Sequence, residues 1–269
     1  MRKIYYLGPK GTYSEYAAKK IKDILNLDLE LIPISTIAKI VDIVQKDNSL
    51  AMLPIENSIE GIVRPAIDCL HESQLEIQAQ IEIDVKHCLY SKGKKENIKH
   101  IISHPQALAQ CQKYILNNFD ENIDLINTSS TAHAVYELDN KDETYAAIAS
   151  CFLDGNNVNL LEKNIQDYKA NKTRFVLASK EKFDFAKNTR TSIVFNTKNE
   201  PGALLKVLEI FKKHGLNLIY LESRPSKKVF GEYNFFADID KGDKEIKEAL
   251  LEIKQACNYY KFLGSYPSV

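Results

Sequence analysis

The sequence lacks several features that would point to particular classes of protein. Its 36 Lys and Arg residues balance its 36 Asp and Glu residues, so the formal net charge is zero. Without an excess of positive charge, the chain offers no broad surface for nucleic acid or an anionic membrane. No apolar run approaches the roughly 18 residues of a membrane span, and the residues after Met1 enter an expected strand rather than a signal peptide. We therefore expect a cytoplasmic protein that binds neither nucleic acid nor membranes.

The sequence also lacks the common signatures of metal and nucleotide sites. Its cysteines form no C-x-x-C pair, and none has a histidine at metal-ligand spacing; they are Cys69, Cys88, Cys111, Cys151 and Cys257. An odd number of scattered cysteines predicts buried free thiols in a reducing compartment and no metal site. No G-x-G-x-x-G fingerprint, P-loop or Ser-His-Asp set is present either.

The length of 269 residues predicts two domains. Strands and helices are expected to alternate over residues 1–180, which predicts an α/β domain of mostly parallel sheets. Ile77–Ser91 is expected to form one long or two successive strands that cross into a second lobe. After a charged linker at residues 180–190, residues 191–269 follow the order β-α-β-β-α-β of a ferredoxin-like unit.

Four expected strand ends in the first domain carry hydroxyl and amide side chains. They are Gly8–Glu15, Pro54–Gly61, Ser103–Gln106 and Thr128–Thr131. Ligands bind at such strand ends in α/β sheets, and helix starts offer free N–H groups to anions. The pattern predicts an anion-binding cleft of neutral donors. Helix capping is the alternative interpretation, since Thr12-x-x-Glu15 and Ser103-x-x-Gln106 are both capping boxes.

A fifth stretch, Asn171–Ala178, is predicted to be a buried strand. Alternation along it places Thr173 and Phe175 on one face and Arg174 on the other. A hydroxyl beside a ring-sized apolar surface suits a pocket for a six-membered ring that carries oxygen. An ordinary strand start with a capping threonine and a surface arginine is the alternative.

In order and spacing, these stretches resemble the prephenate dehydratase family, and the resemblance covers essentially the whole chain. The residues after 190 resemble an ACT regulatory domain. The motifs that carry the resemblance are Gly8-Pro9-x-Gly11-Thr12-Tyr13-Ser14, Pro54-Ile55-Glu56-Asn57-Ser58, Ser103-His104-Pro105-Gln106, Thr128–Thr131, Thr173-Arg174-Phe175, Gly202-Ala203-Leu204-Leu205 and Glu222-Ser223-Arg224-Pro225.

The resemblance implies a fold and a reaction. The catalytic domain, residues 1–180, would have two lobes like a type II periplasmic binding protein, with residues 1–78 and 160–180 in one lobe and 79–159 in the other. Residues 191–269 would form the ACT domain. The implied reaction removes water and CO2 from prephenate to give phenylpyruvate in L-phenylalanine biosynthesis, without a metal or organic cofactor.

The resemblance also implies roles for individual residues. Thr173 is the implied general acid. The other residues linked to catalysis are Glu56, Asn57, Ser103 and Gln110. Those linked to substrate binding are Thr12, Ser14, Ser129, Ser130, Thr131, Arg174 and Phe175. Arg174 could supply charge for the substrate carboxylates, although strand alternation turns it away from Thr173.

L-phenylalanine is the implied effector, bound between the ACT domains of two subunits in a homodimer or homotetramer. The implied effector-binding residues are Gly202, Ala203, Leu204, Leu205, Glu222, Ser223, Arg224 and Pro225. Two alternatives stay open. One is arogenate dehydratase, whose substrate differs by an amino group, and the other is a non-catalytic amino-acid-binding regulator.

Overall fold

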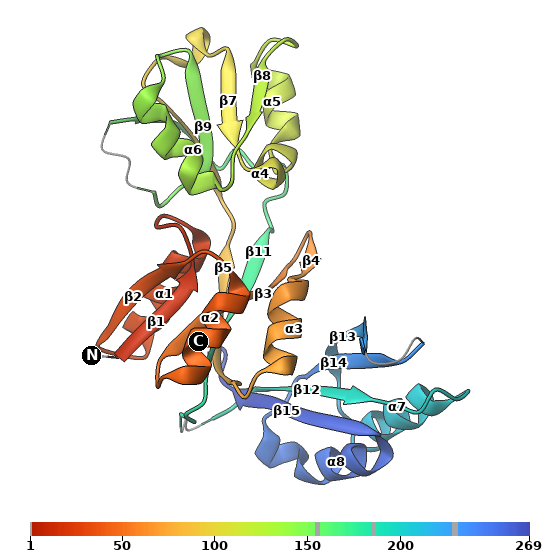
Figure 1. The fold of residues 1–269 in the computed structure, drawn as a ribbon. Helices are drawn as coiled ribbons and strands as arrows, with labels where there is room; N and C mark the ends of the chain where they lie inside the picture. Colours follow the sequence, from red (N-terminus) through yellow and green to blue (C-terminus); the bar gives the residue numbers. More distant parts are fainter. Residues whose placement is uncertain (1, 154–156, 184–186, 228–230) are drawn as a thin grey trace.

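The computed structural model describes residues 2–153, 157–183, 187–227 and 231–269. It contains two lobes and a C-terminal domain, each built on its own sheet (Figure 1). Part of the predicted linker, residues 184–186, lies outside the described residues.

The first lobe is a sheet of strand order β2-β1-β3-β11-β5, with the short β4 paired to β3. Its strands are β1 (Arg2–Leu7), β2 (Leu29–Ile34), β3 (Leu50–Asn57), β4 (Gly61–Ile62), β5 (Glu76–Asp84) and β11 (Lys172–Ser179). Its helices are α1 (Tyr13–Ile24), α2 (Ile37–Lys46) and α3 (Arg64–Glu72). Apolar residues of α1 pack on one face of the sheet, and those of α2 and α3 pack on the other.

The second lobe has the analogous strand order β10-β6-β9-β7-β8. Its strands are β6 (His87–Ser91), β7 (His100–Ser103), β8 (Asp124–Asn127), β9 (Tyr145–Ser150) and β10 (Asn159–Lys163). Its helices are α4 (Pro105–Gln110), α5 (Gln112–Asn118) and α6 (Thr131–Glu137), with short 3-10 turns η1 (Lys95–Asn97) and η2 (Leu138–Asn140).

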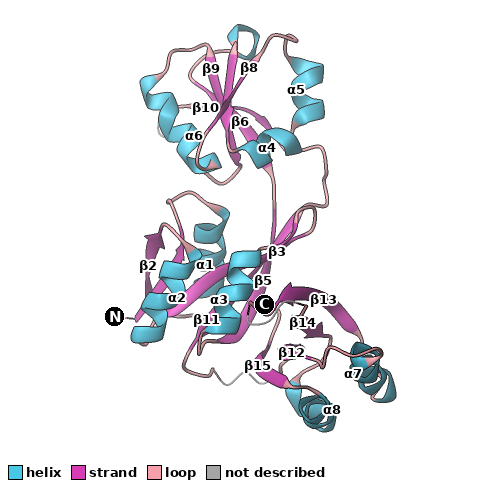
Figure 2. Ribbon diagram, turned by 45° about the vertical axis from the view of Figure 1, so that its right-hand side comes forward, coloured by secondary structure: helices cyan, strands magenta, loops and turns pink. Residues whose placement is uncertain are grey.

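The predicted two-lobed α/β architecture is confirmed, with two differences in detail. The sheet of each lobe is mixed, because β11 in the first lobe and β6 in the second pair antiparallel with both of their neighbours. The lobe boundaries also move: β5 lies wholly in the first lobe, and β10 belongs to the second because it pairs with β6. The chain therefore crosses between lobes at residues 85–86 and 164–171 (Figures 1 and 2).

The C-terminal domain has the predicted β-α-β-β-α-β order. Its elements are β12 (Arg190–Asn196), α7 (Ala203–Lys213), β13 (Leu218–Pro225), β14 (Tyr233–Ile239), α8 (Asp243–Ala256) and β15 (Tyr259–Tyr266). The sheet order is β13-β14-β12-β15, which leaves β13 at one edge. One sheet face packs on α7 and α8. The other face joins the core of the first lobe through Val194, Phe236, Leu263 and Tyr266.

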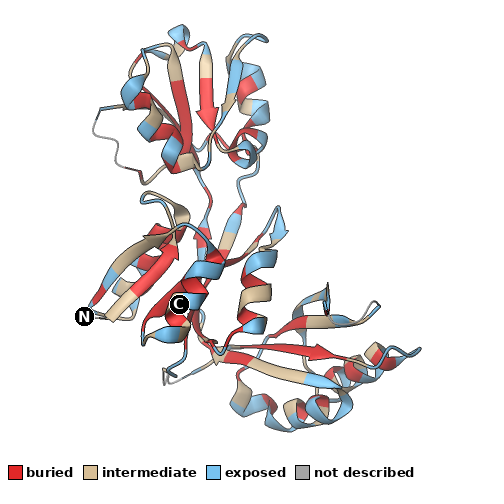
Figure 3. Ribbon diagram, viewed as in Figure 1, coloured by how far each residue is buried: buried red, intermediate tan, exposed pale blue. Residues whose placement is uncertain are grey.

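The two domains approach closely where β15 meets β5, and Gly264 allows this contact. Its φ is +140°, and an added Cβ would lie 2.3 Å from the Ile77 carbonyl oxygen. A side chain would therefore clash with the backbone of the first lobe. Beyond β15, the Gln80 N–H donates to the Pro267 carbonyl at 3.1 Å, and the Val269 N–H donates to the Gln80 carbonyl at 3.0 Å. The buried residues in Figure 3 accordingly continue from the first lobe into the C-terminal sheet.

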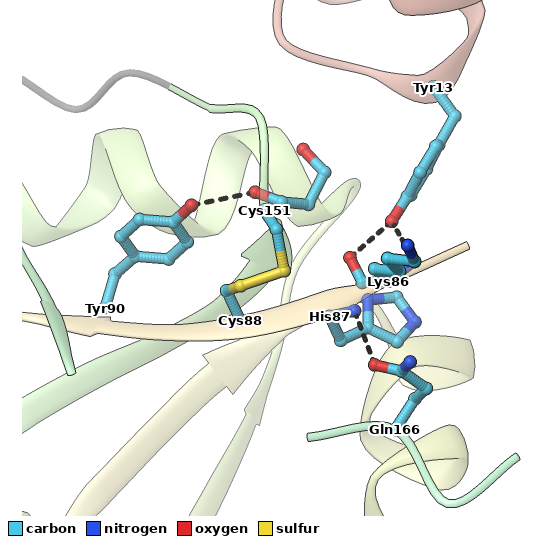
Figure 4. The surroundings of a disulfide bond; sticks show 8 residues. Tyr13, Lys86, His87, Cys88, Tyr90, Cys151 and Gln166 are labelled. Carbon is cyan, nitrogen blue, oxygen red and sulfur yellow. Dashed lines mark hydrogen bonds between the residues drawn. A yellow bond between two sulfur atoms is a disulfide. The ribbon is translucent and has the colours of Figure 1, made fainter. Parts of the chain in front are cut away.

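The prediction that all cysteines are free thiols is wrong for two of them. Cys88 on β6 and Cys151 after β9 form a disulfide, with a Cα–Cα distance of 5.1 Å (Figure 4). Strand pairing explains the proximity: Cys88 lies opposite Ala149 in the β6–β9 ladder, so the chain just beyond β9 passes Cys88. Cys69, Cys111 and Cys257 are free. The cytoplasmic location stays a prediction.

Among the described residues, no helix is both long and apolar enough to cross a bilayer.

Candidate active site

A cavity of about 280 Å³ lies between the two lobes. Its lining residues are Leu7, Gly8, Thr12, Tyr13, Ser14, Pro54, Asn57, Val85, His87, His104, Gln106, Ala107, Gln110, Ser129, Ser130, Thr131, Thr173 and Phe175. This described lining contains no Lys, Arg, Asp or Glu. The cleft therefore combines hydroxyls and amides, as the strand-end pattern predicted, with two imidazoles and an apolar surface.

The start of α1 forms one wall of the cleft. Thr12 caps this helix, because its Oγ1 accepts a hydrogen bond from the Glu15 N–H at 3.4 Å and donates to the Leu7 carbonyl at 3.0 Å. Gly11 has a φ of +83°, and a Cβ there would lie 2.7 Å from Cδ1 of Leu153 in the second lobe. Glycine thus lets the loop before α1 lie directly against the other lobe.

Strand β11 presents Thr173 and Phe175 to the cleft and turns Arg174 to the opposite face. Both Thr173 and Phe175 line the cavity, as alternation predicted. Arg174 is only 5% exposed, and its Nε donates to Oε2 of Glu56 at 3.1 Å. Neither Arg174 nor Glu56 lines the cavity, so the structure does not bring these two predicted site residues to a substrate.

Asn57 holds the hydroxyl of Thr173. The Oδ1 of Asn57 accepts hydrogen bonds from the N–H groups of Ile59 and Glu60, both at 3.0 Å. These two bonds fix the orientation of the amide, since only oxygen can accept them. The Nδ2 of Asn57 then donates to Oγ1 of Thr173 at 2.9 Å. Because the Thr173 oxygen accepts this bond, its own proton is free to point into the cleft.

A buried chain of amides continues from Asn57 into the second lobe. Its Nδ2 also donates to Oδ1 of Asn171 at 2.8 Å. The Nδ2 of Asn171 donates to Oε1 of Gln110 at 3.0 Å, and the same oxygen lies 3.0 Å from Nε2 of His87. The Asn171 carbonyl also accepts from the Val85 N–H at 2.8 Å, which joins the two interlobe connections. The network therefore spans the hinge.

The network fixes the state of His87. Since Oε1 of Gln110 can only accept, the Nε2 of His87 carries a proton. Burial lowers the pKa of His87, and the bond to Gln110 only partly opposes this effect, so the ring is neutral with a bare Nδ1. Nδ1 has no hydrogen-bond partner among the described residues. In Figure 4, His87 lies next to Lys86, whose backbone contacts the Tyr13 hydroxyl, and the His87 N–H donates to Oε1 of Gln166 at 3.0 Å.

The second-lobe wall is formed by the starts of α4 and α6. Ser130 caps α6 by accepting from the His133 N–H at 3.0 Å, and Ser129 and Thr131 line the cavity beside it. The predicted Ser103 capping box is wrong. His104 caps α4 instead, because its Nδ1 accepts from the Gln106 N–H at 3.3 Å.

Ser103 itself points away from the cleft. It is fully buried, and its hydroxyl donates to the Ile148 carbonyl of the neighbouring β9 at 2.6 Å. The structure therefore gives Ser103 a role in holding β7 to β9 and does not bring it to a substrate. By contrast, no hydrogen bond among the described residues uses Nε2 of Gln110, so these N–H groups are available to a ligand.

The two predicted effector motifs lie apart within one chain. Gly202–Leu205 line a second cavity of about 340 Å³ in the C-terminal domain, together with Lys198, Tyr233 and Phe235. Glu222–Pro225 form the end of the edge strand β13 and do not line this cavity. Arg224 instead contacts Asp68 of α3 at 3.0 Å.

His87 and Asn171 are functional candidates that sequence reasoning did not identify. His87 follows the first interlobe crossing directly and Asn171 is the last residue of the second, and these positions were the signal that could have identified them. No three His, Cys, Asp or Glu side chains in the described part of the chain are grouped so that they could hold a metal ion.

Comparison with known proteins gives matches over both domains. The prephenate dehydratase family profile matches residues 4–183, and the ACT domain profile matches residues 191–258. Prephenate dehydratase of Methanocaldococcus jannaschii is 40% identical over 270 residues, covering 98% of this chain and 97% of that protein. Bifunctional chorismate mutase/prephenate dehydratase of Aquifex aeolicus is 38% identical over 270 residues, covering 98% of this chain and 73% of that protein.

A solved structure matches the whole arrangement as well. Prephenate dehydratase from Arthrobacter aurescens, determined in complex with L-Phe, superposes with a TM-score of 0.89 at 29% identity. The match covers 98% of this chain and 90% of that one.

Proposed function

Since the chain belongs to the prephenate dehydratase family and ends in an ACT domain, we propose that Thr173 is the general acid of its reaction. The enzyme converts prephenate to phenylpyruvate with loss of water and CO2. The bond to the ring carboxylate breaks, its electron pair enters the ring, and the ring hydroxyl leaves as water after taking up one proton. Aromatisation drives the reaction, so the protein must orient the dianion and supply that proton.

The bond from Asn57 to Thr173 carries this assignment. An alcohol is a weak acid, and negative charge grows on its oxygen as the proton departs. The Nδ2–H of Asn57, 2.9 Å from Oγ1, points at the atom where this charge develops. A preorganised donor of this kind is worth about 2.7–4 kcal/mol of transition-state stabilisation. Asn57 therefore makes Thr173 a stronger acid without placing any charge in the cleft.

The remaining lining residues suit the rest of the substrate. Phe175 and Pro54 offer an apolar surface to the ring beside Thr173. Thr12, Ser14 and the hydroxyls at residues 129–131 offer donors to the two carboxylates. The free N–H groups of Gln110 reach the cleft from the second lobe. Closing the lobes on the substrate would bring both sets of donors onto the same molecule.

The charge of the cleft favours prephenate over arogenate. Arogenate carries an ammonium group, and a carboxylate is its natural partner. The described lining contains neither Asp nor Glu, and Glu56 is engaged by Arg174 on the opposite face of the sheet. A coupled assay that compares the two substrates tests this preference, and a higher kcat/KM with arogenate would reverse it.

The assignment of Thr173 is tested by a pair of variants. Thr173→Val keeps the shape of the side chain and removes the hydroxyl, whereas Thr173→Ser keeps the hydroxyl. Phenylpyruvate formation from prephenate should fall by about 10²- to 10⁴-fold in kcat for Thr173→Val. Thr173→Ser should retain most of the wild-type rate. A Thr173→Val enzyme within tenfold of wild type would remove Thr173 from the mechanism.

We also propose that L-phenylalanine binds at the cavity beside Gly202–Leu205 and regulates the enzyme. The complex of the Arthrobacter aurescens protein with L-Phe supports an effector of this kind. Gly202 has a φ of +81° and precedes the 11-residue helix α7, whose first N–H groups suit a carboxylate. The edge strand β13 could bring Glu222–Pro225 of a second copy to this cavity. A homodimer would thus complete a site that one chain leaves open.

A further inference from the structure

A buried arginine lies where the catalytic domain meets the ACT domain. Arg174 follows Thr173 directly on β11, and its side chain leaves the sheet on the face opposite to the cleft. That face carries Val176 and Ala178, which share a core with Val194 and Phe236 of the ACT domain. Arg174 is 5% exposed, so its guanidinium lies inside this shared core.

Groups from three different strands hold the guanidinium. Its Nε donates to Glu56 on β3 at 3.1 Å, and its Nη1 donates to Gln80 on β5 at 3.3 Å. Its Nη2 lies 2.7 Å from Oδ2 of Asp238 on β14. Glu56 and Gln80 belong to the catalytic domain, and Asp238 belongs to the ACT domain. Of these ion pairs, the one with Asp238 is the shorter and the more buried, since Asp238 is 0% exposed and Glu56 is 32% exposed.

Asp238 is itself fixed by its own domain. The Ser192 hydroxyl donates to the other carboxylate oxygen of Asp238 and lies 2.6 Å from the hydroxyl of Tyr266. Tyr266 and Ser192 are both fully buried. Burial acts to lower the pKa of Arg174, but Asp238, Tyr266 and Glu56 together raise it, so the guanidinium stays charged. A fixed carboxylate thus faces a permanent cation.

We propose that Asp238 of the ACT domain is a positioning residue for the reaction, acting through Arg174 on the catalytic strand. The inference rests on the proposed role of Thr173. Successive Cα atoms are about 3.8 Å apart, so a shift of Arg174 displaces Thr173 and its bond to Asn57. With Asp238 neutralised, Arg174 keeps its contacts with Glu56 and Gln80, which lie on the strands that flank β11. Arg174 then loses its direct ion pair with the ACT domain, while Gln80 still accepts a hydrogen bond from Arg190 of β12 at 2.9 Å.

The test measures kcat and KM for prephenate in the full-length enzyme. Asp238→Asn keeps the size of the side chain and removes its charge. Since a misplacement of about 1 Å costs on the order of 100-fold in rate, we expect kcat to fall by about 10- to 100-fold. KM should stay within about threefold, because no cleft residue is changed.

A control variant separates positioning from general weakening of the domain contact. Lys261 of β15 also crosses to the catalytic domain, where its Nζ donates to the carbonyls of Leu70 and His71 at 2.7 Å. These carbonyls lie at the end of α3, and no hydrogen bond among the described residues joins them to β11. Lys261→Met should lower the melting temperature while kcat stays within about twofold of wild type.

A double variant provides the readout that a structural role would not produce. If Asp238 acts through Arg174, adding Asp238→Asn to Arg174→Gln lowers kcat no further than Arg174→Gln alone. Lys261→Met added to Arg174→Gln should lower the melting temperature further and leave kcat at the value of Arg174→Gln alone. Losses of kcat that multiply when Asp238→Asn is combined with Arg174→Gln would overturn the inference. A folded Asp238→Asn enzyme with wild-type kcat would overturn it as well.

If Asp238→Asn does not fold, Ser192→Ala replaces it as the test variant, because it keeps the charge of Asp238 and removes one hydrogen bond to that carboxylate. We then expect a kcat several-fold lower, and a kcat equal to wild type refutes the inference. Wild-type enzyme without turnover of prephenate would refute the proposed function itself. Active wild-type enzyme beside an equally active Asp238→Asn variant refutes only the role of Asp238.

Discussion

Replacing Asn57 by aspartate should abolish most activity while leaving the fold intact. The change is nearly isosteric, and it preserves the acceptor that receives the Ile59 and Glu60 N–H groups at 3.0 Å. The turn after β3 therefore survives. What is lost is the Nδ2 donor, which contacts three oxygens, on Asn171, Lys172 and Thr173, at 2.8, 3.1 and 2.9 Å.

The rate effect follows from the reversed polarity at Thr173. A carboxylate oxygen would accept the Thr173 proton instead of supporting its release, so the hydroxyl would turn away from the substrate. Loss of one preorganised donor costs about 10²- to 10³-fold in kcat, or about 2.7–4 kcal/mol. The new negative charge in an otherwise neutral cleft also weakens binding of the dianion, so KM should rise.

The stability effect should be smaller. The side chain of Asn57 is buried, and oxygens left without a donor each cost about 1–3 kcal/mol. Rotation of the Asn171 and Gln110 amides, with a shift of the His87 proton to Nδ1, can restore most of the network. We expect the free energy of unfolding to fall by about 1–3 kcal/mol, which a urea titration measures.

Asn171→Asp is the matched control for Asn57→Asp. It makes the same chemical change one position along the network, keeps the acceptor for Asn57, and does not touch Thr173. Steady-state assays of phenylpyruvate formation should give a kcat loss below about tenfold for this variant, since one neutral hydrogen bond is worth about 0.5–1.5 kcal/mol. Equal losses in the two variants would refute the idea that Asn57 acts on the Thr173 hydroxyl.

Two other predictions concern the disulfide and the effector cavity. The Cys88–Cys151 bond closes a 63-residue separation, so its reduction should lower the free energy of unfolding by about 4 kcal/mol; an unchanged urea midpoint in dithiothreitol would contradict this. Gly202→Val forces a side chain onto a backbone with φ +81° at the effector cavity, and calorimetry should find binding of L-phenylalanine weakened by about tenfold or more. Gly215→Val, at φ +62° and away from that cavity, imposes a similar strain and should bind normally.

Some features of the site were predictable because they depend on near neighbours in the chain. The two-residue period of a strand places Thr173 and Phe175 together and turns Arg174 away. Local hydrogen bonding gives the Thr12–Glu15 cap. The spacing of glycine, proline and apolar residues likewise predicts the ferredoxin-like order after residue 190. Each of these features involves atoms separated by only a few residues.

Other features were decided by tertiary structure, because they join segments that the sequence keeps far apart. The amide chain brings Asn57 to Asn171 across 114 residues and Asn171 to Gln110 across 61. Glu56 and Ser103 matched family motifs, yet strand pairing directs Glu56 to Arg174 and Ser103 to the backbone of β9. The pairing of β6 with β9 likewise brings Cys88 and Cys151 together in a disulfide that the spacing of the cysteines did not reveal.

The sequence by itself determined the order of the elements and which face of each strand a residue takes, since both follow from short-range geometry. Only packing of the three sheets determined which of those faces meet. The meeting of Arg174 with Asp238 depends on where the ACT sheet docks, and no local pattern in either strand encodes that position.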